Sequence, residues 1–177
     1  ENYSLEHLIP EVLAVTNQYS EKKNIPVIAA GGISTGEDIL RFIQLGATGV
    51  QLASIFVPTD ECDASPVFKQ VYISSSKKDA LIIQSPVGMP GRAFDGQFIR
   101  SVNEGNEKPR SCPFHCIKTC DYSKSPYCII KALYNAAKGK MDKGYAFAGA
   151  NAYLANKISS VKEVIAKLKN EFDTASK

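Results

Sequence analysis

The pattern of apolar and polar positions predicts a strand–helix–strand unit near the start of the chain. Residues 27–30 form an apolar run that is too short for a helix and lacks polar alternation, which is typical of a parallel strand buried on both faces. Residues 50–52 form a second short run, for which we expect the same burial. Between them, Ser34 offers a hydroxyl N-cap before acidic first-turn residues, and Gly46 ends the helix. We therefore predict a βαβ unit with two parallel strands.

Each of these predicted strands ends in small residues. Gly31 and Gly32 follow the first strand, and Ala53 and Ser54 follow the second. Glycine lets the backbone adopt unusual dihedral angles and approach a ligand closely, and exposed N–H groups in such turns bind anions, most often phosphate. We predict a phosphate site between the two turns; the alternative is that the glycine pair only forms a tight turn.

Apolar spacing predicts four more helices. The first begins after a cap at Ser4 and breaks at residues 22–24, and the second follows Ser65. The third spans residues 126–138, and the last begins with a capping box at Ser160. In the third helix we expect four side chains to point inward: Ile129, Ile130, Leu133 and Tyr134.

The segments between these helices are less regular. Residues 79–84 are predicted to form a short strand, residues 85–93 a constrained loop, and residues 93–102 a short helix. The polar residues 103–109 form the segment that we expect to be most mobile. Residues 144–153 are small and aromatic, so they either pack in the core or line a site.

Composition limits the class of protein. The 177 residues are 44% apolar and 22% charged, and the formal net charge is only +3 with Lys and Arg scattered. These values favour a globular α/β protein and argue against nucleic acid or an anionic membrane as a partner. We expect a cytoplasmic location, since there is no signal peptide, no membrane-spanning apolar run and an odd number of cysteines, five. Strands buried on both faces need neighbours that this chain scarcely supplies, so we expect part of a larger fold.

Four cysteines gather in one stretch, at Cys112, Cys116, Cys120 and Cys128. A continuous helix through the first three would place the outer two ~12 Å apart, too far for one metal ion. A shared metal would need a non-helical turn, with Cys128 as the fourth ligand. Reduced packing thiols are favoured, redox pairing is the next alternative, and no metal site is assigned.

Several motifs together resemble one family. These are residues 26–33, the Leu45-Gly-Ala-x-Gly-Val-Gln51 segment, Glu61-Cys62, the Gly88-x-Pro-Gly-Arg92 loop, and residues 147–153 and 160–163. Their order resembles the C-terminal half of the flavin-dependent nitronate monooxygenases, formerly 2-nitropropane dioxygenases. The resemblance implies a (β/α)₈ TIM barrel, of which residues 1–64 would supply about the last two strands and helices. Residues 65–177 would form a mostly helical, cysteine-containing C-terminal extension.

The resemblance also implies FMN, with its phosphate between the turns after the seventh and eighth strands. The family's glycine pair and its Gln-x-Gly-Thr motif fall on Gly31, Gly32, Gln51, Leu52, Ala53 and Ser54. Here Ala53 replaces the usual glycine and Ser54 the usual threonine. Ser54 keeps the hydroxyl, and Ala53 is compatible with the phosphate only if its φ is negative.

Other candidate residues are weaker. Arg92, Asn151 and Tyr153 could line the substrate side; the alternatives are a loop arginine that neutralises a carboxylate and a packed aromatic segment. The family's catalytic base is a histidine in a Gly-Gly-His-x-Gly motif, which is absent here, and neither His7 nor His115 matches its context. No catalytic residue is assigned. We expect a fragment or one part of a split enzyme, with the N-terminal half of the barrel as its partner.

Three functions remain open. The first is FMN-dependent oxidation of an alkyl nitronate or nitroalkane by O₂, with this chain supplying the flavin-phosphate half. The second is a flavin-dependent enoyl-acyl-carrier-protein reductase, which is similar around both turns and near Arg92. The third is a non-catalytic half-barrel that binds phosphate ligands or self-associates through strand edges, which includes a possible homo-oligomer.

Overall fold

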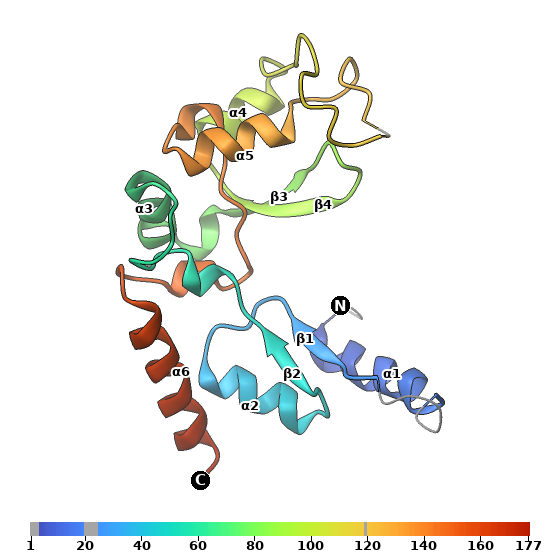
Figure 1. The fold of residues 1–177 in the computed structure, drawn as a ribbon, viewed down its shortest axis with the longest axis vertical. Helices are drawn as coiled ribbons and strands as arrows, with labels where there is room; N and C mark the ends of the chain where they lie inside the picture. Colours follow the sequence, from blue (N-terminus) through green and yellow to red (C-terminus); the bar gives the residue numbers. More distant parts are fainter. Residues whose placement is uncertain (1–3, 20–24, 119) are drawn as a thin grey trace.

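The computed structural model describes residues 4–19, 25–118 and 120–177 (Figure 1). This part of the chain forms a mixed α/β fold with six α-helices and two separate two-stranded sheets. The predicted break of the first helix, at residues 22–24, lies outside the described residues.

The main elements follow one another along the chain with short 3₁₀ turns between some of them. In order they are α1 (Leu5–Asn17), β1 (Ile28–Ala30), α2 (Gly36–Gln44), β2 (Gly49–Gln51), α3 (Pro66–Ser74), β3 (Ala80–Gln84), β4 (Pro90–Phe94), α4 (Gln97–Asn103), α5 (Ile129–Ala137) and α6 (Val161–Ala175).

The predicted βαβ unit is confirmed. Strands β1 and β2 pair in parallel, with Ile28 opposite Gly49. The N-cap of α2 is Thr35 rather than Ser34; the Thr35 side chain accepts a hydrogen bond from the Asp38 amide, and the Asp38 carboxylate accepts one from the Thr35 amide. At Gly46 the helix ends with φ +101°.

The described residues bury only one face of β1, so burial of both faces stays a prediction for the larger fold. Ala29 is only 2% exposed, because α1 and α2 cover its face with Ile9 and Phe42. Ile28, on the opposite face, is 52% exposed. Alternate residues of a strand point to opposite faces, and the described residues cover only one of them.

Helix α6 packs against α2 although about 120 residues separate them in sequence (Figure 1). The Gly36 amide donates to the Glu171 carboxylate at 2.9 Å. A Cβ at Gly36 would lie 2.2 Å from the Leu168 carbonyl oxygen and 2.3 Å from the Phe172 nitrogen, so this contact requires glycine. The last helix therefore belongs structurally with the βαβ unit.

The second sheet is an antiparallel hairpin. Strand β3 confirms the predicted strand, but the prediction of a loop throughout residues 85–93 is wrong, because residues 90–94 form β4. Pro90 is tolerated as the first residue of a two-stranded ribbon, where no further ladder needs its missing N–H. The short helix predicted over residues 93–102 begins only at Gln97.

Helices α4 and α5 pack on this hairpin. The shared core consists of Ile83, Ala93, Phe98, Ile99, Tyr127, Ala132 and Tyr145. Within α5, Ile129 and Leu133 are partly buried as expected, but Ile130 and Tyr134 are exposed. Ala132 and Ala136 take the buried positions instead, because Gly144 presses so closely on α5 that its Cβ would lie 2.1 Å from the Ala132 carbonyl oxygen.

The predicted helix caps differ in outcome. Ser65 accepts hydrogen bonds from the amides of Val67 and Phe68, and Ser160 forms the predicted capping box with Glu163. Hydrogen bonds from Ser160 also hold the pKa of Glu163 below its ordinary value. The predicted cap at Ser4 is wrong, since its side chain accepts no capping hydrogen bond.

Candidate functional site

The two turns of the βαβ unit open into one cavity of about 450 Å³, which we call the turn cavity. The lining contains Ala30, the last residue of β1, with the turn residues 31–34, and Gln51, the last residue of β2, with Ala53 and Ser54. Both turns therefore lie at the carboxyl ends of the strands, as predicted. The full lining is Ala30, Gly31, Gly32, Ile33, Ser34, Gln51, Ala53, Ser54, Val57, Tyr72, Arg92, Phe147, Ala148, Gly149, Asn151 and Ala152.

Backbone conformation leaves N–H groups available in this cavity. Gly31 and Gly32 have φ +103° and +72°, which only glycine adopts readily. Within the part of the chain that the structure describes, the amides of Gly31, Gly32, Ala53 and Ser54 donate no hydrogen bond. Ala53 has φ −133°, so the alanine at this position meets the condition set by the sequence analysis.

Residues 147–152 form a third wall across both turns. The Gly149 amide donates to Ser54 Oγ at 2.9 Å, and Asn151 Nδ2 donates to the Gly32 carbonyl oxygen. A Cβ at Gly149 would lie 2.8 Å from Ser54 Oγ. Because Ser54 Oγ acts as an acceptor here, its own O–H remains available to donate into the cavity.

Arg92 carries the charge of the turn cavity. It reaches the cavity from β4 and, among the residues that the structure describes, is the only Lys, Arg, Asp or Glu in the lining. No carboxylate lies within 4.0 Å of its guanidinium among residues 4–19, 25–118 and 120–177. A guanidinium without a carboxylate, beside unbonded amides, favours an anion.

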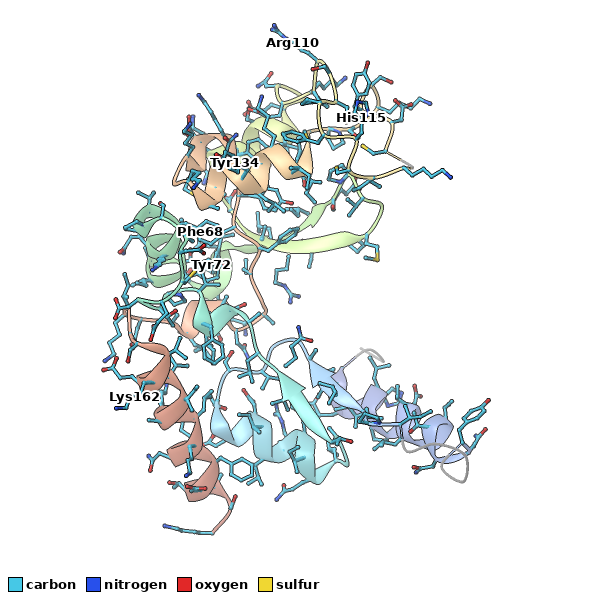
Figure 2. All side chains as sticks on the ribbon, in the orientation of Figure 1. Phe68, Tyr72, Arg110, His115, Tyr134 and Lys162 are labelled. Atoms are coloured by element: carbon cyan, nitrogen blue, oxygen red, sulfur yellow. The ribbon has the colours of Figure 1, made fainter. Side chains whose placement is uncertain are left out.

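Tyr72 also lines the turn cavity but has a structural role. Its side chain comes from α3 and is labelled in Figure 2. Tyr72 is 3% exposed, and its hydroxyl donates to the Phe147 carbonyl oxygen. Burial raises the pKa of Tyr72 far above its ordinary value, and the nearby Cys62 thiol adds to this increase. The phenol therefore stays neutral and holds the third wall in place.

Two predicted site residues lie outside the turn cavity. Leu52 packs against the apolar cluster under β1 and β2, and Tyr153 is not part of the lining. Both histidines are exposed as well: His7 pairs with Glu11 at 3.2 Å, and His115 lies in the loop before α5 with φ +44° (Figure 2).

Sequence reasoning missed other parts of the lining. Val57 and Tyr72 gave no signal, since a single apolar or aromatic residue at helical spacing looks like ordinary core. Phe147, Ala148 and Gly149 lie in the segment predicted either to pack or to line a site. In the structure the segment does both, because Ala148 is 6% exposed and still borders the cavity.

The four clustered cysteines line a different and very small cavity, of about 20 Å³. Residues 112–118 and Cys120 are not helical, and Cys112, Cys116, Cys120 and Cys128 are all free thiols. Among the described residues, no group of three or more His, Cys, Asp or Glu side chains is arranged to hold a metal ion. In the same residues, no helix has both the length and the apolar character needed to cross a membrane.

A parallel βαβ unit with an anion-favouring cavity at its carboxyl end is typical of α/β barrel enzymes that bind phosphate-bearing ligands. The family model for nitronate monooxygenase matches residues 1–171. The chain therefore belongs to the nitronate monooxygenase family, whose members are flavin-dependent oxidoreductases and monooxygenases.

Individual relatives agree with this family. The chain is 33% identical over 96 residues to a probable nitronate monooxygenase of Staphylococcus saprophyticus, covering 54% of the chain and 27% of the relative. It is 27% identical over 159 residues to a probable nitronate monooxygenase of Staphylococcus aureus strain Newman, covering 89% of the chain and 43% of the relative. The chain thus spans less than half the length of these curated relatives.

Solved structures are similar over nearly the whole chain. FabK from Thermotoga maritima has a TM-score of 0.69 at 28% identity, covering 93% of this chain and 49% of that one. Nitroalkane oxidase from Streptomyces ansochromogenes has a TM-score of 0.63 at 23% identity, covering 93% and 44%. Their barrel-type folds agree with the mixed α/β fold seen here.

Proposed function

We propose that this chain binds the phosphate of FMN in the turn cavity, as one half of an enzyme that oxidises alkyl nitronates with O₂. The observation that carries the proposal is that Gly31, Gly32, Ala53 and Ser54, whose amides donate no hydrogen bond, line a cavity in which Arg92 is the one charged side chain among the described residues. A phosphate needs such a set of N–H donors and a cation.

The cavity fits a phosphate sterically. A Cβ at Gly31 would meet nothing within 4 Å, so the space beside the turn is open to a ligand. Ser54 can donate its O–H, and its position is fixed by the Gly149 amide. When bound, FMN would supply the electron-accepting ring; the residues of this chain would bind and orient its phosphate.

Removal of the substrate proton is not assigned to the turn cavity. Among the described residues, neither a carboxylate nor an imidazole lines the turn cavity. We propose that the catalytic base and the missing strands come from the part of the barrel that this chain does not span. The exposed face of β1, with Ile28, would then be covered in the assembled enzyme. The domain division at residue 64 and the cytoplasmic location stay predictions.

A second candidate is a flavin-dependent enoyl-acyl-carrier-protein reductase. It is favoured by the similarity to FabK at 28% identity, which exceeds the 23% to nitroalkane oxidase. The two functions differ in substrate. Oxygen consumption with propionate-3-nitronate would support nitronate oxidation. NADH-dependent reduction of a crotonyl thioester without nitronate turnover would instead assign the reductase function.

Titration with FMN tests the phosphate site directly. Arg92→Gln should lower FMN affinity about tenfold, because a charge-assisted contact to phosphate is lost, and Ser54→Ala should lower it less. Arg100→Gln is the matched control, since this exposed arginine on α4 lines neither the turn cavity nor the other large cavity near α4 and α5. Flavin fluorescence quenching gives the affinities. Equal affinity in wild type, Arg92→Gln and Ser54→Ala would contradict the proposal.

A further inference from the structure

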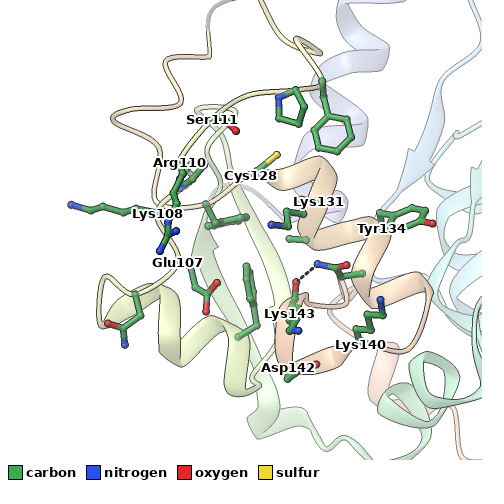
Figure 3. A pocket seen from close by; sticks show the side chains of 18 of the residues that line it. Glu107, Lys108, Arg110, Ser111, Cys128, Lys131, Tyr134, Lys140, Asp142 and Lys143 are labelled. Carbon is green, nitrogen blue, oxygen red and sulfur yellow. Dashed lines mark hydrogen bonds between the residues drawn. The ribbon is translucent and has the colours of Figure 1, made fainter.

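A second and larger cavity lies on the other side of the hairpin, between α4, α5 and the loop that precedes Ser111 (Figure 3). Its volume is about 890 Å³, within the range of small-molecule sites. Among the described residues, it shares no lining residue with the turn cavity. We call it the basic cavity, because of the side chains described next.

Among the charged side chains of the basic cavity, positive ones outnumber negative ones. The lining contains the basic residues Lys108, Arg110, Lys131, Lys140 and Lys143 and the acidic residues Glu107 and Asp142. This excess of three equals the whole formal net charge of +3, since the remaining 16 basic and 16 acidic residues cancel. The chain is therefore neutral apart from this one cavity.

These cations have no carboxylate partner among the described residues. None of the five lies within 4.0 Å of a carboxylate in the described ranges, 4–19, 25–118 and 120–177. Glu107 is engaged with another group, since its carboxylate accepts a hydrogen bond from Ser101 Oγ at 2.6 Å. Like charges that gather without acidic partners repel one another, so binding of an anion among them stabilises the folded protein.

The cations stand on two walls. Lys108 and Arg110 come from the loop after α4, Lys131 comes from α5, and Lys140 and Lys143 come from the segment after α5 (Figure 3). A single carboxylate or chloride ion is too small to contact both walls of a cavity of this volume. A ligand with several negative groups along a chain can do so.

We propose that the basic cavity binds an oligophosphate, either the diphosphate or triphosphate of a nucleotide or inorganic polyphosphate. Lys and Arg are the side chains that hold phosphates, and the charge of such a group matches the excess in the cavity. Aromatic rings lie in the same lining: Phe98 and Tyr127 are buried, and Phe114 and Tyr134 are exposed. The exposed rings would give a nucleotide base a surface for stacking.

Calorimetric titration of the purified protein at low salt tests the proposal, with ADP, inorganic tripolyphosphate and orthophosphate as probes. ADP and tripolyphosphate should bind, and orthophosphate should bind much more weakly. Tighter binding of ADP than of tripolyphosphate assigns the site to nucleotides, and the reverse assigns it to inorganic polyphosphate. About 0.5 M NaCl should weaken binding strongly, because exposed charges are screened.

Charge reversal tests whether oligophosphate binds in the basic cavity. The double variant Arg110→Glu/Lys131→Glu should lower oligophosphate affinity at least about tenfold, since two attractive charges become repulsive. Lys162→Glu, on the exposed face of α6, is the matched control and should bind as wild type does (Figure 2). Arg92→Gln should also bind oligophosphate normally, which separates this site from the turn cavity.

Three results would overturn the proposal. They are no binding of either oligophosphate at low salt, equal binding by the double variant, and binding of an acidic peptide in the absence of oligophosphate binding. Circular dichroism confirms that the variants are folded. FMN affinity is measured on the same samples, so failure of this site and failure of the proposed flavin site are distinguished.

Discussion

The turn cavity and the basic cavity attract anions by different means. The turn cavity uses backbone amides held by glycine conformations and one guanidinium, Arg92. The basic cavity uses five long side chains and a net positive charge. Backbone donors are fixed once the fold forms, whereas each lysine or arginine side chain loses conformational entropy when it is ordered on a ligand.

The two cavities should therefore be sensitive to different substitutions and conditions. A backbone-built site fails when a Cβ is added or a supporting helix moves, and it tolerates surface charge changes. A site built from side chains tolerates small backbone shifts but fails on charge reversal or at high salt. Each cavity also depends on a helix pressed against a glycine: Gly36 contacts α6, and Gly144 contacts α5.

The largest effect should come from those two glycines. In Gly36→Ala the new Cβ would overlap backbone atoms of Leu168 and Phe172, and in Gly144→Ala it would overlap those of Ala132 and Ala136. Backbone atoms cannot rotate away as a side chain can. We therefore expect the free energy of unfolding of each variant to fall by about 3 kcal/mol or more. Thermal unfolding measures the loss.

The two variants should also separate the cavities. Gly36→Ala should lower FMN affinity more than oligophosphate affinity, and Gly144→Ala should do the reverse. Gly96→Ala is the control, because its Cβ meets nothing within 4 Å and its φ of −165° suits any residue. Unfolding of all three variants at the wild-type temperature would contradict the close contacts of Gly36 with α6 and of Gly144 with α5.

The turn cavity was largely predictable from the sequence, and physical reasons explain why. Gly31, Gly32 and Ser54 directly follow short apolar runs, so local sequence alone places them at strand ends. The sequence also indicates that this chain lacks neighbours for two-sided burial, but a run such as residues 27–30 does not show which face stays uncovered.

The basic cavity left no such signal. Lys108, Arg110, Lys131, Lys140 and Lys143 are spread over 36 positions and look scattered in the sequence. They come together only through the packing of α4 and α5 on a hairpin whose second strand was predicted as loop. Strand β4 was missed because Pro90 and Gly91 are typical of turns, while its partner β3 supplies the pairing.

An intermediate effect is expected for Gly31→Ala. Its φ of +103° is strained for alanine, so stability should fall by about 1–2 kcal/mol, and the added methyl group should lower FMN affinity about tenfold. Gly105→Ala is the matched control, since its φ of +81° and open surroundings are similar but it lines neither cavity. Fluorescence titration and thermal unfolding report the two effects. A similar loss of FMN affinity in both variants would mean that strain, rather than the turn cavity, is responsible.

The smallest effect should come from Tyr72→Phe, which removes one hydrogen bond from the third wall of the turn cavity. At neutral pH the loss should be about 1 kcal/mol, because the Phe147 carbonyl oxygen loses its donor while the ring still packs. Tyr134→Phe, in an exposed ring, should leave stability unchanged at neutral pH.

Alkaline pH sharpens this last comparison. The pKa of Tyr72 is raised in the folded state, so above about pH 10 the unfolded chain releases this proton first and the free energy of unfolding falls as pH rises. Below that pH the contribution is fully present. Tyr72→Phe should make the alkaline loss shallower but not abolish it, because burial also raises the pKa values of Tyr127 and Tyr145 in the core under α5. Urea unfolding at several pH values measures the slope, and an unchanged slope would show that Tyr72 ionises as readily in the folded protein as in the unfolded chain.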